Sequence, residues 1–180
     1  MSSVKKITIT ALLIALCRVL PMAFHAVGLG QTFSPMHLPV LLCGLICGPV
    51  YGAVCGVAGP VLASLLGGPS VQSLIWFIPE LLCYGLVSGL LYRRIRTGST
   101  LTDMYLSLVP AMLVGRVVGG AAQAAFLLAT AKAWTPAAWV TGYFIKTWPG
   151  AVSHLVLIPA IVFALIGAGL VPRRYGRKGK

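Results

Sequence analysis

Long apolar runs separated by short polar stretches dominate this chain. Four of the runs are each long enough to cross a lipid bilayer as one helix, which takes about 20 residues: residues 7–24, 71–92, 105–131 and 148–171. A fifth apolar stretch, residues 38–66, is long for one crossing and short for two. The pattern predicts an all-helical membrane protein.

Basic residues decide how the ambiguous stretch is divided. They form three clusters beside apolar runs: Lys5 and Lys6; Arg93, Arg94 and Arg96; and Arg173, Arg174, Arg177, Lys178 and Lys180. Positive residues beside membrane helices stay on the cytoplasmic side. An even number of crossings must then separate successive clusters, so residues 38–49 and 51–66 should form a hairpin that turns near Gly48 and Pro49. We expect a single domain, residues 1–180, of six transmembrane helices with both termini cytoplasmic, in a bacterial plasma membrane.

Composition supports a lipid environment and excludes several functions. Of the 180 residues, 58% are hydrophobic and 9% charged, whereas soluble domains carry about a quarter charged residues. The net charge of +12 falls mostly in the three clusters, so it does not indicate nucleic-acid binding. The chain has no phosphate-binding loop, nucleophile elbow or zinc-protease motif. The five cysteines all fall in predicted spans and read as packing residues, so we expect no cofactor and no metal site.

Small residues recur at helical spacing in four of the predicted spans. Glycines four residues apart let helix backbones approach closely in lipid. The sets are Gly44, Gly48, Gly52 and Gly56 in the hairpin, Gly85 and Gly89 in the span at 71–92, and Gly115 and Gly119 in the span at 105–131. They predict tight helix packing.

Few ionisable residues remain within or near the spans: Arg18, Glu80, Arg116, Lys146 and His154. Asp103 and Lys132 are expected in loops. A charge at the centre of a membrane helix costs ~2.5–3.5 kcal/mol, so such groups should pair or face a hydrated cavity. A rise of about 1.5 Å per residue places Arg18, Glu80 and Arg116 at similar depths toward the outer face. We expect them to meet in a ligand cavity; a purely structural ion pair of Glu80 with Arg116 or Arg18 is the alternative.

Aromatic and polar residues near these charges complete the candidate site. Trp76, Glu80 and Tyr84 are spaced four apart, and the connection at residues 26–37 combines glycines with apolar residues, which suits a lid. The candidate ligand contacts are Phe33, Met36, His37, Trp76, Glu80, Tyr84, Arg116, Gln123, Trp148 and His154. Packing of the aromatic residues and a re-entrant loop at residues 26–37 are the alternatives.

Several segments together resemble the substrate-binding S component of energy-coupling factor (ECF) vitamin transporters. They are SPMHLPVLLCG at residues 34–44, GPVYG at 48–52, ELLCYGLVSGLLY at 80–92, AMLVGR at 111–116, and WPG at 148–150 with LIP at 157–159. These segments together cover most of the chain. The order in which they follow one another along the predicted spans is the main support for the resemblance.

The resemblance implies a function that the residues alone do not. Such subunits bind a vitamin near the outer face and work with a transmembrane coupling (T) subunit and two ABC ATPases, which would explain the missing ATP motif. Ala11 and Ala15 match the small-residue spacing that family members present to the coupling subunit. The excess of Arg18, Arg116 and Lys146 over Glu80 favours a carboxylate ligand such as pantothenate; a neutral cobalamin precursor such as dimethylbenzimidazole is the alternative.

Two other classes of protein remain open from the sequence. One is an intramembrane enzyme that uses His25, His37 or His154 with a buried carboxylate. The other is a stand-alone carrier of small solutes that needs no partner subunit.

Overall fold

The structure is a computed structural model that describes residues 1–26, 28 and 30–175. Helices form nearly all of its regular structure, and the described residues contain no β-strand. The elements are α1 (Ser3–Ala26), α2 (Gly30–Phe33), α3 (His37–Cys47), α4 (Pro49–Leu65), the 3₁₀ turn η1 (Val71–Ser73), α5 (Leu74–Arg94), α6 (Thr100–Ala129), α7 (Pro136–Val140), the π-helical segment η2 (Thr141–Ile145) and α8 (Trp148–Gly167). The all-helical class predicted from the apolar pattern is confirmed.

Length and hydropathy make four helical segments capable of crossing a bilayer: Ser3–Ala26, Val71–Arg94, Thr100–Ala129 and Pro136–Gly167. α3 and α4 are also apolar but shorter, with 11 and 17 residues. They meet at Gly48, whose φ of 103° is in the region that favours glycine. Pro49, the first residue of α4, lacks the N–H that a helix start leaves unbonded anyway.

The expectation that Asp103 lies in a loop was wrong. α6 begins at Thr100, because Ser99 caps it by accepting a hydrogen bond on its side chain from the Thr102 N–H. Asp103 therefore lies in the first helical turn and not in a loop. An acidic residue is stabilising there, since the N-terminal end of a helix carries partial positive charge.

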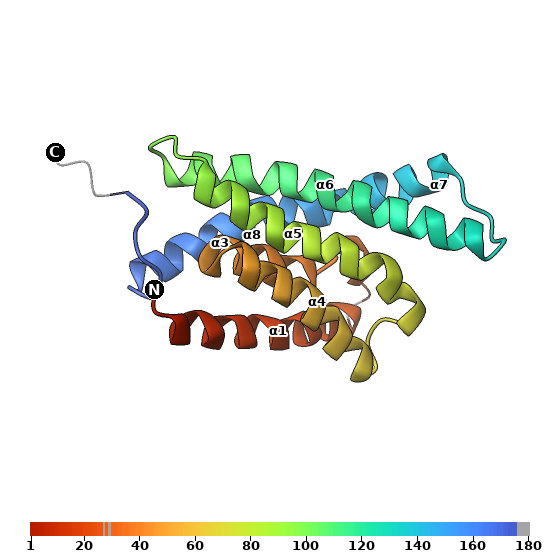
Figure 1. The fold of residues 1–180 in the computed structure, drawn as a ribbon, viewed down its shortest axis with the longest axis horizontal. Coiled ribbons are helices and arrows are strands. Elements are labelled where there is room, and N and C mark those ends of the chain that lie inside the picture. Colours follow the sequence, from red (N-terminus) through yellow and green to blue (C-terminus); the bar gives the residue numbers. More distant parts are fainter. Residues whose placement is uncertain (27, 29, 176–180) are drawn as a thin grey trace.

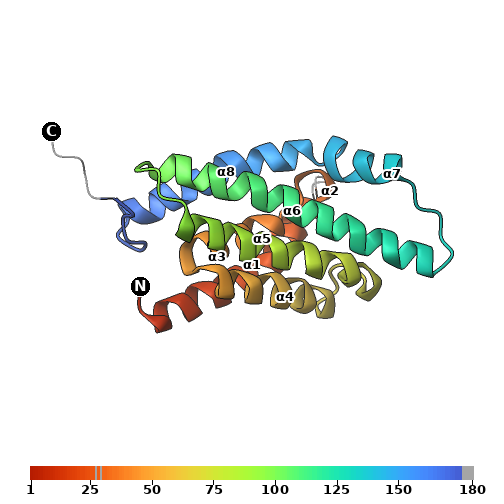
Figure 2. The same cartoon turned by 45° about the horizontal axis from the view of Figure 1, so that its top comes forward.

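α5 lies between the α3–α4 pair and α6 in both ribbon views (Figures 1 and 2), and it contacts all three of these helices. Glycines allow this close packing. A Cβ atom on Gly85 of α5 would lie 2.1 Å from the Gly52 carbonyl oxygen of α4, and one on Gly44 of α3 would lie 2.4 Å from the Gly85 carbonyl oxygen. Because there is no room for a Cβ atom at these positions, the backbones of the three helices are in direct van der Waals contact, which stabilises their packing.

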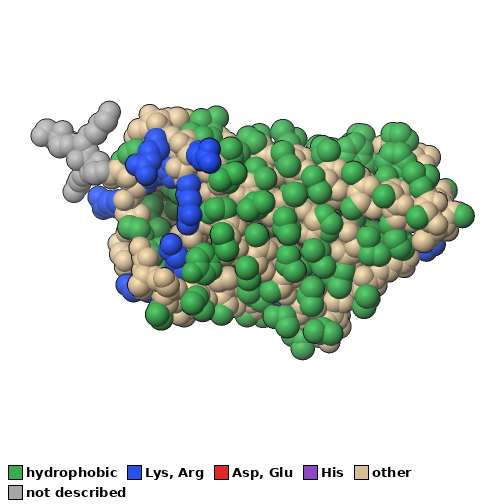
Figure 3. Space-filling model, in the orientation of Figure 1, with side chains coloured by type: hydrophobic (Ala, Val, Ile, Leu, Met, Phe, Trp, Pro, Cys, Tyr) green, Lys and Arg blue, Asp and Glu red, His purple; other side chains and the backbone are tan. Residues whose placement is uncertain are grey.

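The two ends of the helical bundle differ in charge. The N-terminus, the α5–α6 connection and the segment after α8 lie at one end of the molecule (Figures 1 and 2). The Lys and Arg side chains visible in Figure 3 gather mainly at this end, whereas hydrophobic side chains cover much of the rest of that face. We call this the basic end. The connections α4–α5 and α6–α7 lie at the opposite end.

At the basic end, the segment after α8 is tied to the α5–α6 connection. Arg174 Nε lies 2.7 Å from Asp103 Oδ2, and the Arg174 guanidinium carbon lies 4.1 Å from the centre of the Tyr92 ring. The Tyr175 hydroxyl donates to the same Asp103 oxygen at 2.5 Å, and the Thr97 N–H and hydroxyl donate to Oδ1 at 2.8 and 2.7 Å. The buried carboxylate of Asp103 thus has a partner on both oxygens.

Candidate ligand-binding site

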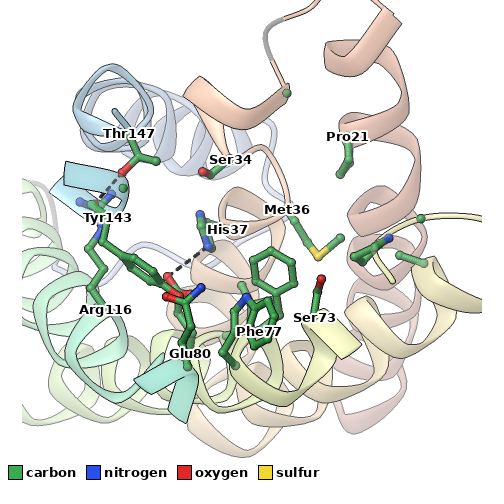
Figure 4. Close-up of a pocket in the computed structure, with 18 of the residues that line it drawn as sticks. Pro21, Ser34, Met36, His37, Ser73, Phe77, Glu80, Arg116, Tyr143 and Thr147 are labelled. Carbon is green, nitrogen blue, oxygen red and sulfur yellow. Dashed lines mark hydrogen bonds and ion pairs between the residues drawn. The ribbon is translucent and has the colours of Figure 1, made fainter. Parts of the chain in front are cut away.

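A cavity of about 940 Å³ opens at the end of the bundle opposite the basic end. Its walls come from α1, the start of α3, the α4–α5 connection, α5, α6 and residues 133–147 (Figure 4). Both the volume and the mixture of apolar walls with a few polar groups are typical of sites for small molecules.

Glu80 lies on the α5 wall of this cavity and is only 3% exposed. One helical turn further along α5, the Tyr84 hydroxyl donates a hydrogen bond of 2.9 Å to Glu80 Oε1. From α3, His37 Nε2 lies 3.5 Å from the same oxygen. Gly119 on α6 makes room for the carboxylate, because a Cβ atom there would lie 2.9 Å from Glu80 Oε2. Two neighbouring helices and α5 itself therefore fix this carboxylate.

His37 connects the cavity to a second buried histidine. As the first residue of α3, it faces the cavity, and its ring stands edge-on to the rings of Tyr84 and His154, with centroids 4.9 and 5.9 Å away. His154 comes from α8, is 2% exposed, and has no hydrogen-bond partner on Nδ1. It lies behind His37 and lines a separate apolar groove between α1 and α8. His37 thus faces the cavity, and His154 faces that groove.

Arg116 lies on the α6 wall and is 7% exposed. Its guanidinium carbon lies 5.4 Å from the centre of the Phe144 ring. Within the described part of the chain, the ion pairs shorter than 4.0 Å are Glu80 with His37 and Asp103 with Arg174. The structural alternative from the sequence, an ion pair of Glu80 with Arg116 or Arg18, is therefore not present in the described residues.

Arg18 lies on the α1 side of the cavity and has another role. Its Nη2 donates a hydrogen bond of 2.7 Å to the Leu66 carbonyl, at the C-terminal end of α4. Carbonyls in the last turn of a helix have no partner within the helix. Arg18 therefore joins α1 to the α4–α5 connection at the edge of the cavity.

The segment of residues 133–147, which lies between the expected spans at 105–131 and 148–171, forms another wall of the cavity. Trp134, Trp139, Tyr143 and Thr147 all line the cavity. Trp139 packs directly on α6, where a Cβ atom on Gly120 would lie 1.9 Å from its indole Nε1. Trp139 and Tyr143 are four residues apart, the same spacing as Trp76 and Glu80. This spacing in the sequence could have identified the segment as part of the site. π-Helical turns such as η2 occur frequently at functional sites.

The structure brings together six of the ten candidate ligand contacts on the cavity wall: Met36, His37, Trp76, Glu80, Arg116 and Gln123. The other four lie elsewhere. Tyr84 lies beneath Glu80 and His154 behind His37. Phe33 packs on the ring of Phe24 at 5.7 Å, and Trp148 is 61% exposed. Arg18 and His25 line the cavity as well, whereas Lys146 is exposed and is not among the lining residues.

The connection between α1 and α3, expected to act as a lid, is partly helical. α2 packs against α1 and α8. A Cβ atom on Gly150 of α8 would lie 2.7 Å from the Phe33 carbonyl oxygen, so this glycine lets α2 approach closely. Ser34, Pro35 and Met36 line the cavity beside it. Residues 27 and 29, also part of the expected lid, lie outside the described residues.

Ala11 and Ala15 are exposed on one face of α1, while Leu13 and Cys17 of the same helix are buried in the core.

Cys17, Cys43, Cys47 and Cys55 are buried free thiols. In the part of the chain that the structure describes, no three His, Cys, Asp or Glu side chains are grouped as metal ligands.

A ligand-sized cavity enclosed by apolar helices is the architecture of a membrane protein that binds a small molecule. Comparison with known families gives the class: the model of the substrate-specific component of ECF transporters matches residues 5–171. The chain belongs to this family. It is therefore a substrate-binding subunit of a membrane transporter and not an enzyme. No curated protein and no solved structure gives a significant match.

Proposed function

We propose that this protein captures a vitamin or a related micronutrient in the cavity and presents it for ATP-driven import. The observation that carries the proposal is the cavity of about 940 Å³ whose walls bring Glu80, His37 and Arg116 together from three helices. Buried polar groups of this kind are costly in a membrane protein unless they serve a pathway or a ligand. The apolar wall residues, among them Met36 and Trp76, would contact the less polar part of the ligand.

The same proposal includes the orientation of the chain in a bacterial plasma membrane. Six crossings, with α3 and α4 as a short hairpin, would put both termini in the cytoplasm. The gathering of Lys and Arg side chains at the basic end (Figure 3) supports this orientation, because positive residues remain on the cytoplasmic side. The cavity would then face the exterior, where the nutrient is captured.

We further propose that a coupling T subunit and two ABC ATPases complete the transporter. Family membership supports this assembly, since the chain itself has no phosphate-binding loop. The exposed face of α1 with Ala11 and Ala15 is the proposed contact with the T subunit. Its small side chains would let a partner helix approach closely.

Pantothenate is the first candidate ligand, because the basic groups Arg18 and Arg116 outnumber the single cavity carboxylate, Glu80. The test is uptake of radiolabelled pantothenate by bacterial cells that lack their own importer. Cells that express this chain together with a T subunit and its ATPases should accumulate the label, and cells that express the chain alone should not. Accumulation by the chain alone would instead indicate a stand-alone carrier.

A second measurement does not depend on the identity of the ligand. Purified protein is denatured and the released small molecules are identified by mass spectrometry. A retained micronutrient is expected in about one copy per chain. If no small molecule is released after growth in several media, and none of a panel of vitamins binds, the proposed function is wrong.

A further inference from the structure

Arg116 is a buried cation whose charge no carboxylate of the described residues neutralises directly. The whole chain contains only two Asp or Glu residues. Glu80 is paired with His37 and Asp103 with Arg174, and neither lies within 4.0 Å of the Arg116 guanidinium. The groups that the structure places near Arg116 are neutral: the Phe144 ring at 5.4 Å and the Tyr84 side chain.

Such an arrangement is unfavourable without a further partner. A buried arginine usually finds a carboxylate or phosphate, because its planar guanidinium offers five N–H donors and stays charged. A cation–π contact with a ring is weaker than an ion pair and leaves the positive charge in place. Arg116 lines the cavity and is 7% exposed, so a group bound inside the cavity can reach it.

Glu80 is poorly available for this role, although it faces the same cavity. Its Oε1 already accepts from the Tyr84 hydroxyl at 2.9 Å and lies 3.5 Å from His37 Nε2. Figure 4 shows the His37 side chain joined to Glu80 on one side of the site, while the Arg116 side chain extends toward the segment of Tyr143 and Thr147. Glu80 thus has partners before any ligand arrives, whereas the neighbours of Arg116, Phe144 and Tyr84, include no anion.

We propose that the ligand itself supplies the counter-ion of Arg116, through a carboxylate bound at the wall formed by α6 and η2. This inference rests on the proposed function and narrows its substrate class to micronutrients with a single carboxylate. A phosphate ester would carry nearly two charges, but among the residues that the structure describes only one buried Lys or Arg, Arg116, lacks an anionic partner. Of the other basic side chains that line the cavity, His37 has its Nε2 3.5 Å from Glu80 Oε1, and Arg18 is bonded to the Leu66 carbonyl at the cavity edge.

The proposal also assigns the two ends of the ligand. Its carboxylate lies at Arg116, and its less polar part extends past Tyr143 toward Trp76, Phe77 and Met36, which line the same cavity. A neutral ligand such as dimethylbenzimidazole would leave the Arg116 charge buried and without an anion. The structure thus favours the carboxylate candidate over the neutral one.

The test compares ligands that differ only in the charged group. Binding of pantothenate and of pantothenol, in which a CH₂OH group replaces the carboxylate, is measured by isothermal titration calorimetry on the purified full chain in nanodiscs. The compound released from the purified protein is identified by mass spectrometry in parallel. We expect a released monocarboxylic acid, and we expect pantothenol to bind at least about tenfold more weakly than pantothenate. A released neutral compound or phosphate ester, or equal affinities of the two probes, would overturn the inference while leaving the receptor function intact.

A second set of binding measurements uses substitutions of Arg116. Arg116→Gln should weaken binding of the carboxylate about 100-fold and that of pantothenol at most a few-fold, and Arg116→Lys should recover part of the loss because it restores the charge without the planar fork. Arg96→Gln removes the same charge from an exposed site at the basic end and should change neither affinity. Equal losses for both probes in Arg116→Gln would assign Arg116 a structural role instead. If the Arg116→Gln variant does not fold, the comparison of pantothenate with pantothenol on the unaltered protein still tests whether the ligand binds through a carboxylate. Release of no compound and binding of none would count against the proposed function itself.

Discussion

Asp103 and Arg174 form a buried ion pair, with 2.7 Å between Oδ2 and Nε, that joins the first turn of α6 to the segment after α8. Asp103 is fully buried, and removing one partner of a buried pair leaves the other without compensation. Asp103→Ala should therefore lower the free energy of unfolding by about 3 kcal/mol, measured by thermal or denaturant unfolding in detergent.

Arg173→Gln is the matched control for that measurement, because Arg173 is exposed beside Arg174 and exposed charges contribute about 0–1 kcal/mol. Its melting temperature should stay close to that of the unaltered protein. Equal melting temperatures for Asp103→Ala and Arg173→Gln would show that the ion pair does not stabilise the fold.

Gly85 of α5 lies against the backbone of Gly52 in α4. Gly85→Ala places a methyl group 2.1 Å from the Gly52 carbonyl oxygen, and a backbone atom cannot move aside without separating the helices. The change should destabilise the protein by about 2 kcal/mol or more, seen as a lower melting temperature or loss of monodisperse protein. Gly167→Ala is the control, since nothing lies within 4 Å of its added methyl group. A Gly85→Ala protein as stable as this control would contradict close packing of α5 against the Gly52 backbone of α4.

Ala11 and Ala15 offer a test of the proposed contact with the T subunit. Replacing both by Trp should abolish ATP-driven uptake, because bulky side chains prevent close approach of a partner helix, while the ligand affinity of the purified chain stays unchanged. Leu106→Trp enlarges an exposed position on α6 instead and should leave uptake intact. Unchanged uptake in the Ala11 and Ala15 variant would remove this face as the docking surface.

Trp139 and Trp148 lie close in sequence but differ in their relation to the cavity. Trp139 lines it, whereas Trp148 is 61% exposed on the outside of α8. Trp139→Ala should weaken ligand binding about tenfold, as expected for an aromatic side chain that contacts the ligand, and Trp148→Ala should change it less than twofold. Calorimetric titration with the retained ligand measures both. A larger loss of affinity for Trp148→Ala than for Trp139→Ala would show that Trp148, and not Trp139, contacts the ligand.

The helical class and the approximate helix positions could be predicted because lipid imposes a simple rule on sequence: apolar runs of sufficient length become helices. The meeting of Glu80 and Arg116 at one cavity was also predictable. Both lie at a similar depth in the expected bundle, and buried polar groups avoid lipid. These predictions needed only the hydropathy and the rise per residue.

The partners of individual charges could not be predicted in this way. Arg174 was grouped with the charges that orient the chain, and Asp103 was placed in a loop. Their contact depends on how the segment after α8 folds back, which hydropathy does not encode. The wall at residues 133–147 was missed for a related reason: its helices are short, with five residues each in α7 and η2, and Trp139 is held in place by the absence of a side chain at Gly120.

The placement of the tryptophans has a practical consequence. Three of the four, Trp76, Trp134 and Trp139, border the cavity, and the fourth is outside it. A bound molecule would displace water from beside three indole rings at once, so the protein carries its own optical reporter of occupancy. Fluorescence emission of the unlabelled chain would follow capture and release in real time, with Trp148 as a constant background.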